Sequence, residues 1–195
     1  MNIILLLPKK EIIWQLAIAV LLIVIGITYR LFPHPPNFTP VAAIAIFGGV
    51  YLSSRIALSL PIVIMALSDM LIGSYELNLM IFVYISFILS VALGFFVKRY
   101  KNWASIAGSS VLSAVLFFII TNFAVWAFTP WYSKDFSGII QCYYMALPFL
   151  KNNIAGNLFY TGILFGLFEV ARVFVKNFLK LKSSQKFNSD FFSNN

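Results

Sequence analysis

The sequence predicts an all-α membrane protein, a bundle of about six transmembrane helices whose N- and C-termini are both cytoplasmic. Of its 195 residues, 61% are hydrophobic and 10% are charged, whereas a soluble domain has about 25% charged residues. The mean hydropathy is +0.92, and apolar runs recur along the chain with the basic residues between them. A chain this short cannot enclose so much apolar surface in a soluble core, but lipid covers such surface directly.

Apolar runs between helix breakers mark the expected membrane spans. Each run should be helical, because lipid offers the backbone polar groups no other partners. Together they form one domain over 1–176, and 177–195 is expected to be a polar, basic, disordered cytoplasmic tail that is either solvated or in contact with anionic lipid. The predicted spans lie near 12–32, 41–53, 56–73, 79–97, 104–128 and 154–176.

The first two runs need separate arguments. The run 12–32 follows two lysines like a secretory signal, but it is about 31 Å long as a helix and no small-residue cleavage pattern follows it, so it should remain as the first span. The run 41–53 is short for a full crossing and is expected to be tilted, extended or partly re-entrant. Thr39 and Pro40 before it predict an N-cap followed by proline at the first helical position.

The basic residues predict the orientation. With six crossings, all fourteen lysines and arginines except Arg30, Lys134 and Lys151 fall in the tail or in loops on one face. The positive-inside rule therefore places both termini in the cytoplasm. The same distribution accounts for the net charge of +8 without nucleic acid, since no run of five basic residues occurs.

Several kinds of chemistry are excluded or made improbable by missing residues. Cys142 is the only cysteine and His34 the only histidine, so cysteine-clustered and histidine-rich metal sites are excluded. No phosphate-binding loop, GxGxxG, HExxH or GxSxG pattern occurs. We expect no cofactor, no metal and no enzyme activity; a membrane enzyme is the lowest-ranked alternative and would require His34 or Asp69 to be essential.

The first outward loop, Pro33 to Pro40, contains four prolines in eight residues and should be stiff. It has two interpretations. It is either a lid over a pocket, with His34 and Asn37 contacting a ligand, or a rigid connector at the membrane interface.

Asp69 lies near the outward end of the third predicted span. A carboxylate at that depth is costly, so it either serves a function inside the bundle or reaches water at the headgroups. We include it among the candidate ligand-binding residues.

Two polar and aromatic helix faces are expected near the outward side. Asn122 and Trp126 are four residues apart in the fifth span, and Asn157 and Tyr160 are three apart in the sixth. If these faces meet, with Trp131 and Tyr132 from the loop between the spans, they would form a small-molecule pocket. The alternative is an interfacial aromatic belt with asparagines that bond between helices.

Two pairs of small residues predict close helix packing. Ala45 and Gly49 are four apart in the second run, and Gly162 and Gly166 form a GxxxG step in the sixth. Either step serves packing within the bundle or docking to a partner subunit.

Three segments carry a resemblance that covers most of the chain. They are RLFPHPPNFTPVAAIAIFGGVYL, TNFAVWAFTPWY and CYYMALPFLKNNIAGNLFYTGILFG. They resemble a family of small bacterial membrane proteins described as transporters of unknown substrate, which is similar to the S components, the substrate-binding subunits of energy-coupling factor transporters. The resemblance implies a six-helix subunit of the bacterial inner membrane that binds a vitamin-like solute from outside and pairs with a transmembrane coupling subunit and ATPases. S components dock through AxxxA in the first helix, where this chain has Ala17 and Ala19, two apart.

The sequence therefore favours a transporter subunit without its own ATPase, in which the Pro-rich loop closes over a small solute. Trp126 and Trp131 would stack on the solute, and Asn122, Asn157 and Asp69 would orient it. The alternative is a non-transporting membrane scaffold similar to the rod-shape morphogenesis subunits, which would need no pocket.

Overall fold

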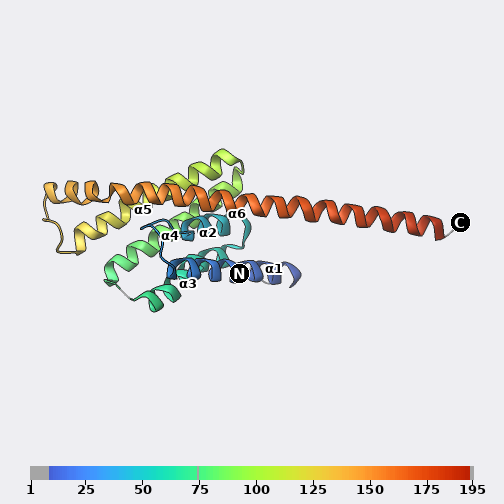
Figure 1. The fold of residues 1–195 in the computed structure, drawn as a ribbon, viewed down its shortest axis with the longest axis horizontal. Helices are drawn as coiled ribbons and strands as arrows, with labels where there is room; N and C mark the ends of the chain where they lie inside the picture. Colours follow the sequence, from blue (N-terminus) through green and yellow to red (C-terminus); the bar gives the residue numbers. More distant parts are fainter. Residues whose placement is uncertain (1–8, 74, 194–195) are drawn as a thin grey trace. The chain divides into compact units, whose positions relative to one another are not determined.

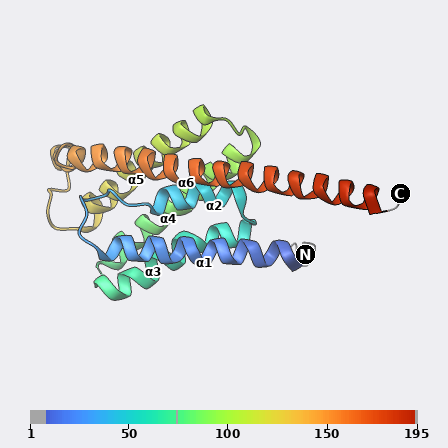
Figure 2. The same cartoon turned by 45° about the vertical axis from the view of Figure 1, so that its right-hand side comes forward.

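The computed structural model of the chain describes the backbone of residues 9–73 and 75–193, with side chains described over 11–73 and 75–177. All regular structure in these ranges is helical (Figures 1 and 2), which confirms the predicted all-α class. Five of the helices, all but α2, are long and apolar enough to cross a membrane. The helices are α1 (Lys9–Leu31), α2 (Val41–Tyr51), α3 (Ser54–Ile72), α4 (Leu77–Arg99), α5 (Trp103–Phe128) and α6 (Phe136–Ser193).

The chain divides into two units, Met1–Thr161 and Gly162–Asn195. The first unit contains α1 to α5 and the beginning of α6. Figures 1 and 2 show that loops 32–40 and 129–135 lie at one end of this unit, where α3 also ends. We call this the pocket end. The connections α2–α3 and α4–α5 lie at the other end.

Helix α2 is short and almost completely enclosed by protein. Its 11 residues make a helix about 17 Å long, well below the hydrocarbon thickness of about 30 Å. Every residue from Val41 to Val50 is buried, as expected for a helix that is apolar on all sides. The N-cap position is Pro40, one residue later than the predicted Thr39, and no side chain caps the helix.

Backbone contact between α2 and α4 at two glycines explains how α2 fits inside the bundle. The Cα atom of Gly94 lies 2.9 Å from the position that a Cβ atom on Gly49 would occupy. A Cβ atom on Gly94 would collide with the carbonyl oxygen of Ile46. Gly49 was a predicted packing residue, and Ala45, its predicted companion, is fully buried.

Polar side chains join α4, α5 and α6 through their buried faces. The hydroxyl groups of Ser90 and Ser113 are 2.7 Å apart, and those of Ser110 and Thr161 are 3.2 Å apart. Asn157 donates from Nδ2 to the carbonyl oxygen of Ser110 at 3.3 Å. Such bonds substitute for water where the helices pack in an apolar medium.

The sixth helix differs most from the prediction. It begins at Phe136, not near 154, and Pro148 lies inside it. Its start is stabilised by Asp135, whose Oδ1 accepts a hydrogen bond from the N–H of Gly138 at 2.7 Å. A side-chain cap of this kind supplies a partner for a donor of the first turn, so the helix can begin well before Pro148.

The sequence predicts a disordered tail over 177–195, and helix α6 extends into this segment. The backbone remains helical to Ser193, because neither glycine nor proline follows Gly166 to interrupt it. The helix has 58 residues, more than the roughly 20 that cross a bilayer. In the second unit, Arg172 and Glu169 form an ion pair at 3.5 Å. A methyl group at Gly162 or Gly166 would meet no atom of the described residues within 4 Å.

The Asp135 cap leads to a prediction about pH. The N–H of Gly138 and then the hydroxyl of Ser133 lower the pKa of Asp135. Because the folded-state pKa lies below the ordinary value, the stabilisation is present above about pH 4 and is lost as the pH falls through the lower folded-state pKa. We expect Asp135→Ala to speed hydrogen exchange in the first turn of α6 at neutral pH. Wild-type protein should show the same loss only in acid, whereas equal protection in both proteins at neutral pH would contradict this assignment.

Candidate solute pocket

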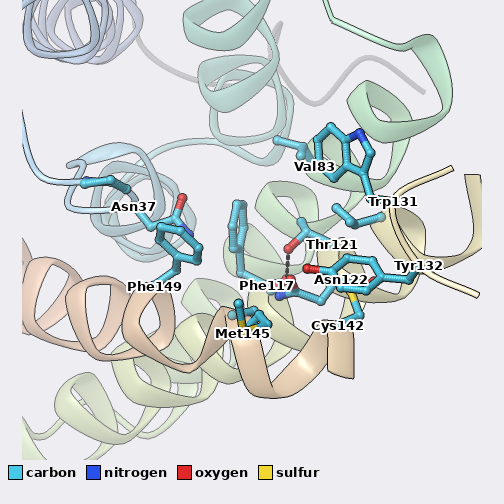
Figure 3. Close-up of a pocket in the computed structure, with 13 residues that line it drawn as sticks. Asn37, Val83, Phe117, Thr121, Asn122, Trp131, Tyr132, Cys142, Met145 and Phe149 are labelled. Carbon is cyan, nitrogen blue, oxygen red and sulfur yellow. Dashed lines mark hydrogen bonds between the residues drawn. The ribbon is translucent and has the colours of Figure 1, made fainter. Parts of the chain in front are cut away.

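A cavity of about 330 Å³ opens at the pocket end of the first unit (Figure 3). This volume lies at the lower end of the range of about 300–1,000 Å³ for small-molecule sites. The lining comes from loop 32–40, α4, α5, loop 129–135 and the start of α6. The lining residues are Pro36, Asn37, Val83, Phe117, Thr121, Asn122, Val125, Trp131, Tyr132, Cys142, Met145, Ala146 and Phe149.

The walls of this cavity are apolar and aromatic. The described residues that line it include a few neutral polar groups and no charged side chain. The Thr121 hydroxyl donates to the carbonyl oxygen of Phe117 at 2.7 Å, and Asn122 donates from Nδ2 to the carbonyl oxygen of Phe118 at 2.8 Å. The Oδ1 atom of Asn122 has no donor within the described ranges, so it is available as an acceptor. Such walls bind a ring and orient it through a few hydrogen bonds.

The structure pairs α5 and α6 in a different register from the predicted one. Cys142 and Tyr143 of α6 donate to the carbonyl oxygens of Asn122 and Ile119, at 3.4 and 2.7 Å. Asn157 contacts α5 at Ser110, which is about 18 Å along the helix from Asn122. The predicted meeting of the Asn122 and Asn157 faces is therefore wrong, because α6 begins 18 residues earlier than its predicted start near 154.

Trp126 supports the pocket without lining it. Its indole N–H donates to the carbonyl oxygen of Ser133 at 3.0 Å. Lys134 donates to the carbonyl oxygen of Thr129 at 2.6 Å and also to that of Trp126. These bonds close the loop that carries Trp131 and Tyr132, both of which line the cavity.

The Pro-rich loop is held against α1 and α6 by specific contacts. The ring of His34 stacks on Tyr29 with centroids 5.3 Å apart, and its buried Nδ1 atom has no partner among the described residues. Phe38 packs edge-on against Tyr160 at 5.4 Å. Asn152 donates to the carbonyl oxygen of Pro36 at 3.2 Å. His34 and Tyr160 therefore contribute to the packing of the loop, and neither lines the cavity.

Asn37 is the residue of this loop that reaches the site. Its φ of 61° is the only positive φ of a non-glycine residue in the described part of the chain. Asparagine tolerates this conformation better than most residues. The side chain lines both the cavity of about 330 Å³ and a second, smaller one of about 20 Å³.

The smaller cavity, the inner chamber, lies where α2, α4, α5 and α6 converge. It shares Asn37 and Phe117 with the larger cavity. Its volume is enough for about one water-sized group. Its lining residues are Asn37, Thr39, Ala42, Phe87, Phe117, Asn153 and Asn157.

Asp69 lies in another place, where α1, α3 and α4 meet. Its Oδ1 accepts from Arg30 at 2.8 Å and its Oδ2 from the Tyr84 hydroxyl at 2.9 Å. The side chains of Arg30 and Asp69 are 15% and 3% exposed. Asp69 lines a separate cavity of about 520 Å³ and is not among the residues that line the cavity of Asn122 and Trp131.

The negative charge of Asp69 also affects Tyr75, which lies in the turn after α3. Removal from water and then the carboxylate of Asp69 raise the pKa of Tyr75 to about 12, against a smaller opposite effect of Arg30. The phenol of Tyr75 is therefore protonated at neutral pH. The described residues contain no cluster of three side chains suited to holding a metal ion.

Comparison with models of known protein families gives a match that covers most of the chain. Residues 10–180 match the model of a family described as a family of unknown function (DUF6580). The chain belongs to this family. No curated protein and no solved structure matches it. The family match spans every described residue that lines the cavity of about 330 Å³ or the inner chamber.

Several residues of the site were not among the sequence candidates. Thr121, Cys142 and Phe149 line the large cavity, and Asn153 lines the inner chamber. The adjacent amides at 152 and 153, which follow Lys151 between two apolar runs, were a signal for this part of α6. Arg30, counted only as an outward basic residue, is the partner of Asp69.

Proposed function

We propose that this protein is the solute-binding subunit of a bacterial membrane transporter, similar to an S component. The observation that carries the proposal is the open cavity between Asn37, Asn122 and Trp131. It has aromatic walls, and none of the described residues that line it is charged. A small, partly aromatic solute would enter beside the Pro-rich loop. Trp131 and Tyr132 would contact its ring, and Asn37 and Asn122 would orient it.

The buried short helix α2 supports this proposal. Transporters place substrate sites beside interrupted helices whose ends lie inside the bundle. Here α2 begins in the interior, after loop 32–40, and its residue Ala42 lines the inner chamber. A scaffold that only holds partners has no need for a half-length helix ending at a cavity.

The charge distribution supports an orientation in the bacterial inner membrane with both termini in the cytoplasm and the pocket outside. Arg55, Lys98, Arg99 and Lys101 lie at or beside the two connections opposite the pocket end. The positive-inside rule assigns that end to the cytoplasm. Without a phosphate-binding loop in its sequence, the chain would depend on a separate coupling subunit and ATPases to drive transport.

Native mass spectrometry of protein purified in a mild detergent tests the proposal. We expect wild-type protein to carry a small-molecule adduct, and Trp131→Ala to reduce the adduct about tenfold or more, because a solute in the cavity would cover the ring of Trp131 and aromatic anchors dominate many binding sites. Trp103→Ala is the matched control, since Trp103 is exposed to a similar extent, 60% against 70% for Trp131, and is not among the residues that line either cavity.

The same spectra distinguish the alternatives. Bound coupling subunits or ATPases would support the S-component assignment. Absence of any adduct, together with retention of cell-wall morphogenesis proteins, would instead support the membrane scaffold.

A further inference from the structure

The inner chamber is bounded by the uncapped start of α2. The first hydrogen bond of this helix runs from the N–H of Ile44 to the carbonyl oxygen of Pro40 at 2.8 Å. The N–H groups of Val41, Ala42 and Ala43 precede it, and none has a hydrogen-bond partner within the described part of the chain. All three residues are buried.

Unpartnered buried N–H groups are rare in proteins, and each requires an acceptor. Helix α2 begins with Pro40, which has no side-chain oxygen to serve as a cap. Thr39 and Ala42 line the chamber, so the first turn of α2 forms part of its wall. The partial positive charge at a helix N-terminus also favours an electronegative atom at this position.

Asn153 provides a second and independent indication of a ligand. Its side chain lines the chamber and is 5% exposed, yet it has no hydrogen-bond partner among the described residues. Asn157, also on the chamber wall, is 2% exposed and uses its Nδ2 for the backbone of Ser110. A buried amide without a partner costs free energy that a ligand hydrogen bond would recover.

We propose that the inner chamber is a subsite for one carbonyl oxygen of the transported solute, held by the first turn of α2 and by the amide of Asn153. This inference rests on the proposed solute-binding function and narrows its substrate class. The ring of the solute occupies the larger cavity. Its carbonyl, as part of an amide, lactam or similar neutral group, passes between Asn37 and Phe117 into the chamber.

The carbonyl is uncharged for two reasons. Among the side chains that the structure describes, no lysine or arginine lines either cavity, and burial of a carboxylate without a cationic partner is costly. The chamber volume of about 20 Å³ also suits one oxygen atom better than the two oxygens of a carboxylate.

Isothermal titration calorimetry with matched probes tests this assignment on the full chain. The probes are nicotinamide with nicotinate, and 2-naphthamide with 2-naphthoate. In each pair the ring is constant and an amide replaces a carboxylate. We expect the amide to bind at least about tenfold more tightly than the carboxylate. Only the carboxylate must either take up a proton or be buried as an unpaired charge.

A variant series tests the residues. Asn153→Leu fills the chamber and removes the amide, and should weaken amide binding about tenfold. Asn78→Leu is the control, because Asn78 is exposed and its amide reaches only Glu76, at 3.4 Å. Carboxylates that bind as tightly as the amides would overturn the assignment, and so would unchanged amide binding in a folded Asn153→Leu protein.

The outcomes also separate this inference from the proposed function. If carboxylates bind and Trp131→Ala weakens them, the pocket binds solutes and only the carbonyl subsite is wrong. If no probe binds and native mass spectrometry finds no retained solute, both proposals fail.

Discussion

Asp69→Asn should be among the most destabilising single substitutions in this protein, with a loss of about 3–5 kcal/mol in the free energy of unfolding. The change leaves the guanidinium of Arg30 buried without its carboxylate at 2.8 Å. It also replaces the acceptor of the Tyr84 hydroxyl. Because Arg30, Asp69 and Tyr84 come from three helices, the damage should extend across α1, α3 and α4. Thermal unfolding in detergent measures the effect.

Two comparisons show whether the effect arises from an unpaired buried charge. Arg30→Met combined with Asp69→Leu removes both charges and should recover most of the lost stability, since apolar replacements of a buried pair are often neutral. Arg172→Gln breaks the pair with Glu169 from its exposed partner, since Arg172 is 66% exposed, and should cost about 0.5 kcal/mol or less. Equal effects of Asp69→Asn and Arg172→Gln would contradict a buried ion pair.

Gly94→Ala should be the other severe change, although it adds only one methyl group. The new Cβ atom would collide with the carbonyl oxygen of Ile46, a backbone atom that cannot move without a shift of α2. Overpacking of this kind costs about 1–3 kcal/mol or more. Displacement of α2 would also distort the inner chamber, so we expect solute retention to fall together with stability.

Gly108→Ala is the matched control for this substitution. Gly108 also lies inside a helix, α5, but a Cβ atom there would meet no atom within 4 Å. Alanine is favoured over glycine within a helix, so this variant should be unchanged or more stable by up to about 1 kcal/mol. Similar losses for the two variants in thermal unfolding would show that α2 and α4 do not cross at Gly94.

The helices that the sequence predicted well are those with clear signals at both ends. The predicted runs 56–73, 79–97 and 104–128 agree closely with α3, α4 and α5. Glycine, proline or polar residues interrupt the apolar pattern at each boundary. The start of α6 was missed because Pro148 resembles a breaker, whereas the Asp135 cap allows the helix to begin before it.

The candidate site was predicted in part. Asn37, Asn122, Trp131 and Tyr132 do line one cavity, because loop 32–40 and loop 129–135 are at the same end of the bundle. Contacts between residues far apart in the chain could not be predicted from the sequence. Arg30 and Asp69 are separated by 39 positions, and nothing in the local pattern of either residue indicates the other.

A cryo-electron-microscopy map of wild-type protein, purified gently and bound to an antibody fragment, tests the solute pocket most directly. We predict non-protein density between Asn37, Asn122 and Trp131, with an extension toward Asn153 and the first turn of α2. Density only in the cavity beside Asp69, or a pocket closed by the side chains of Phe117 and Phe149, would contradict solute capture at this site.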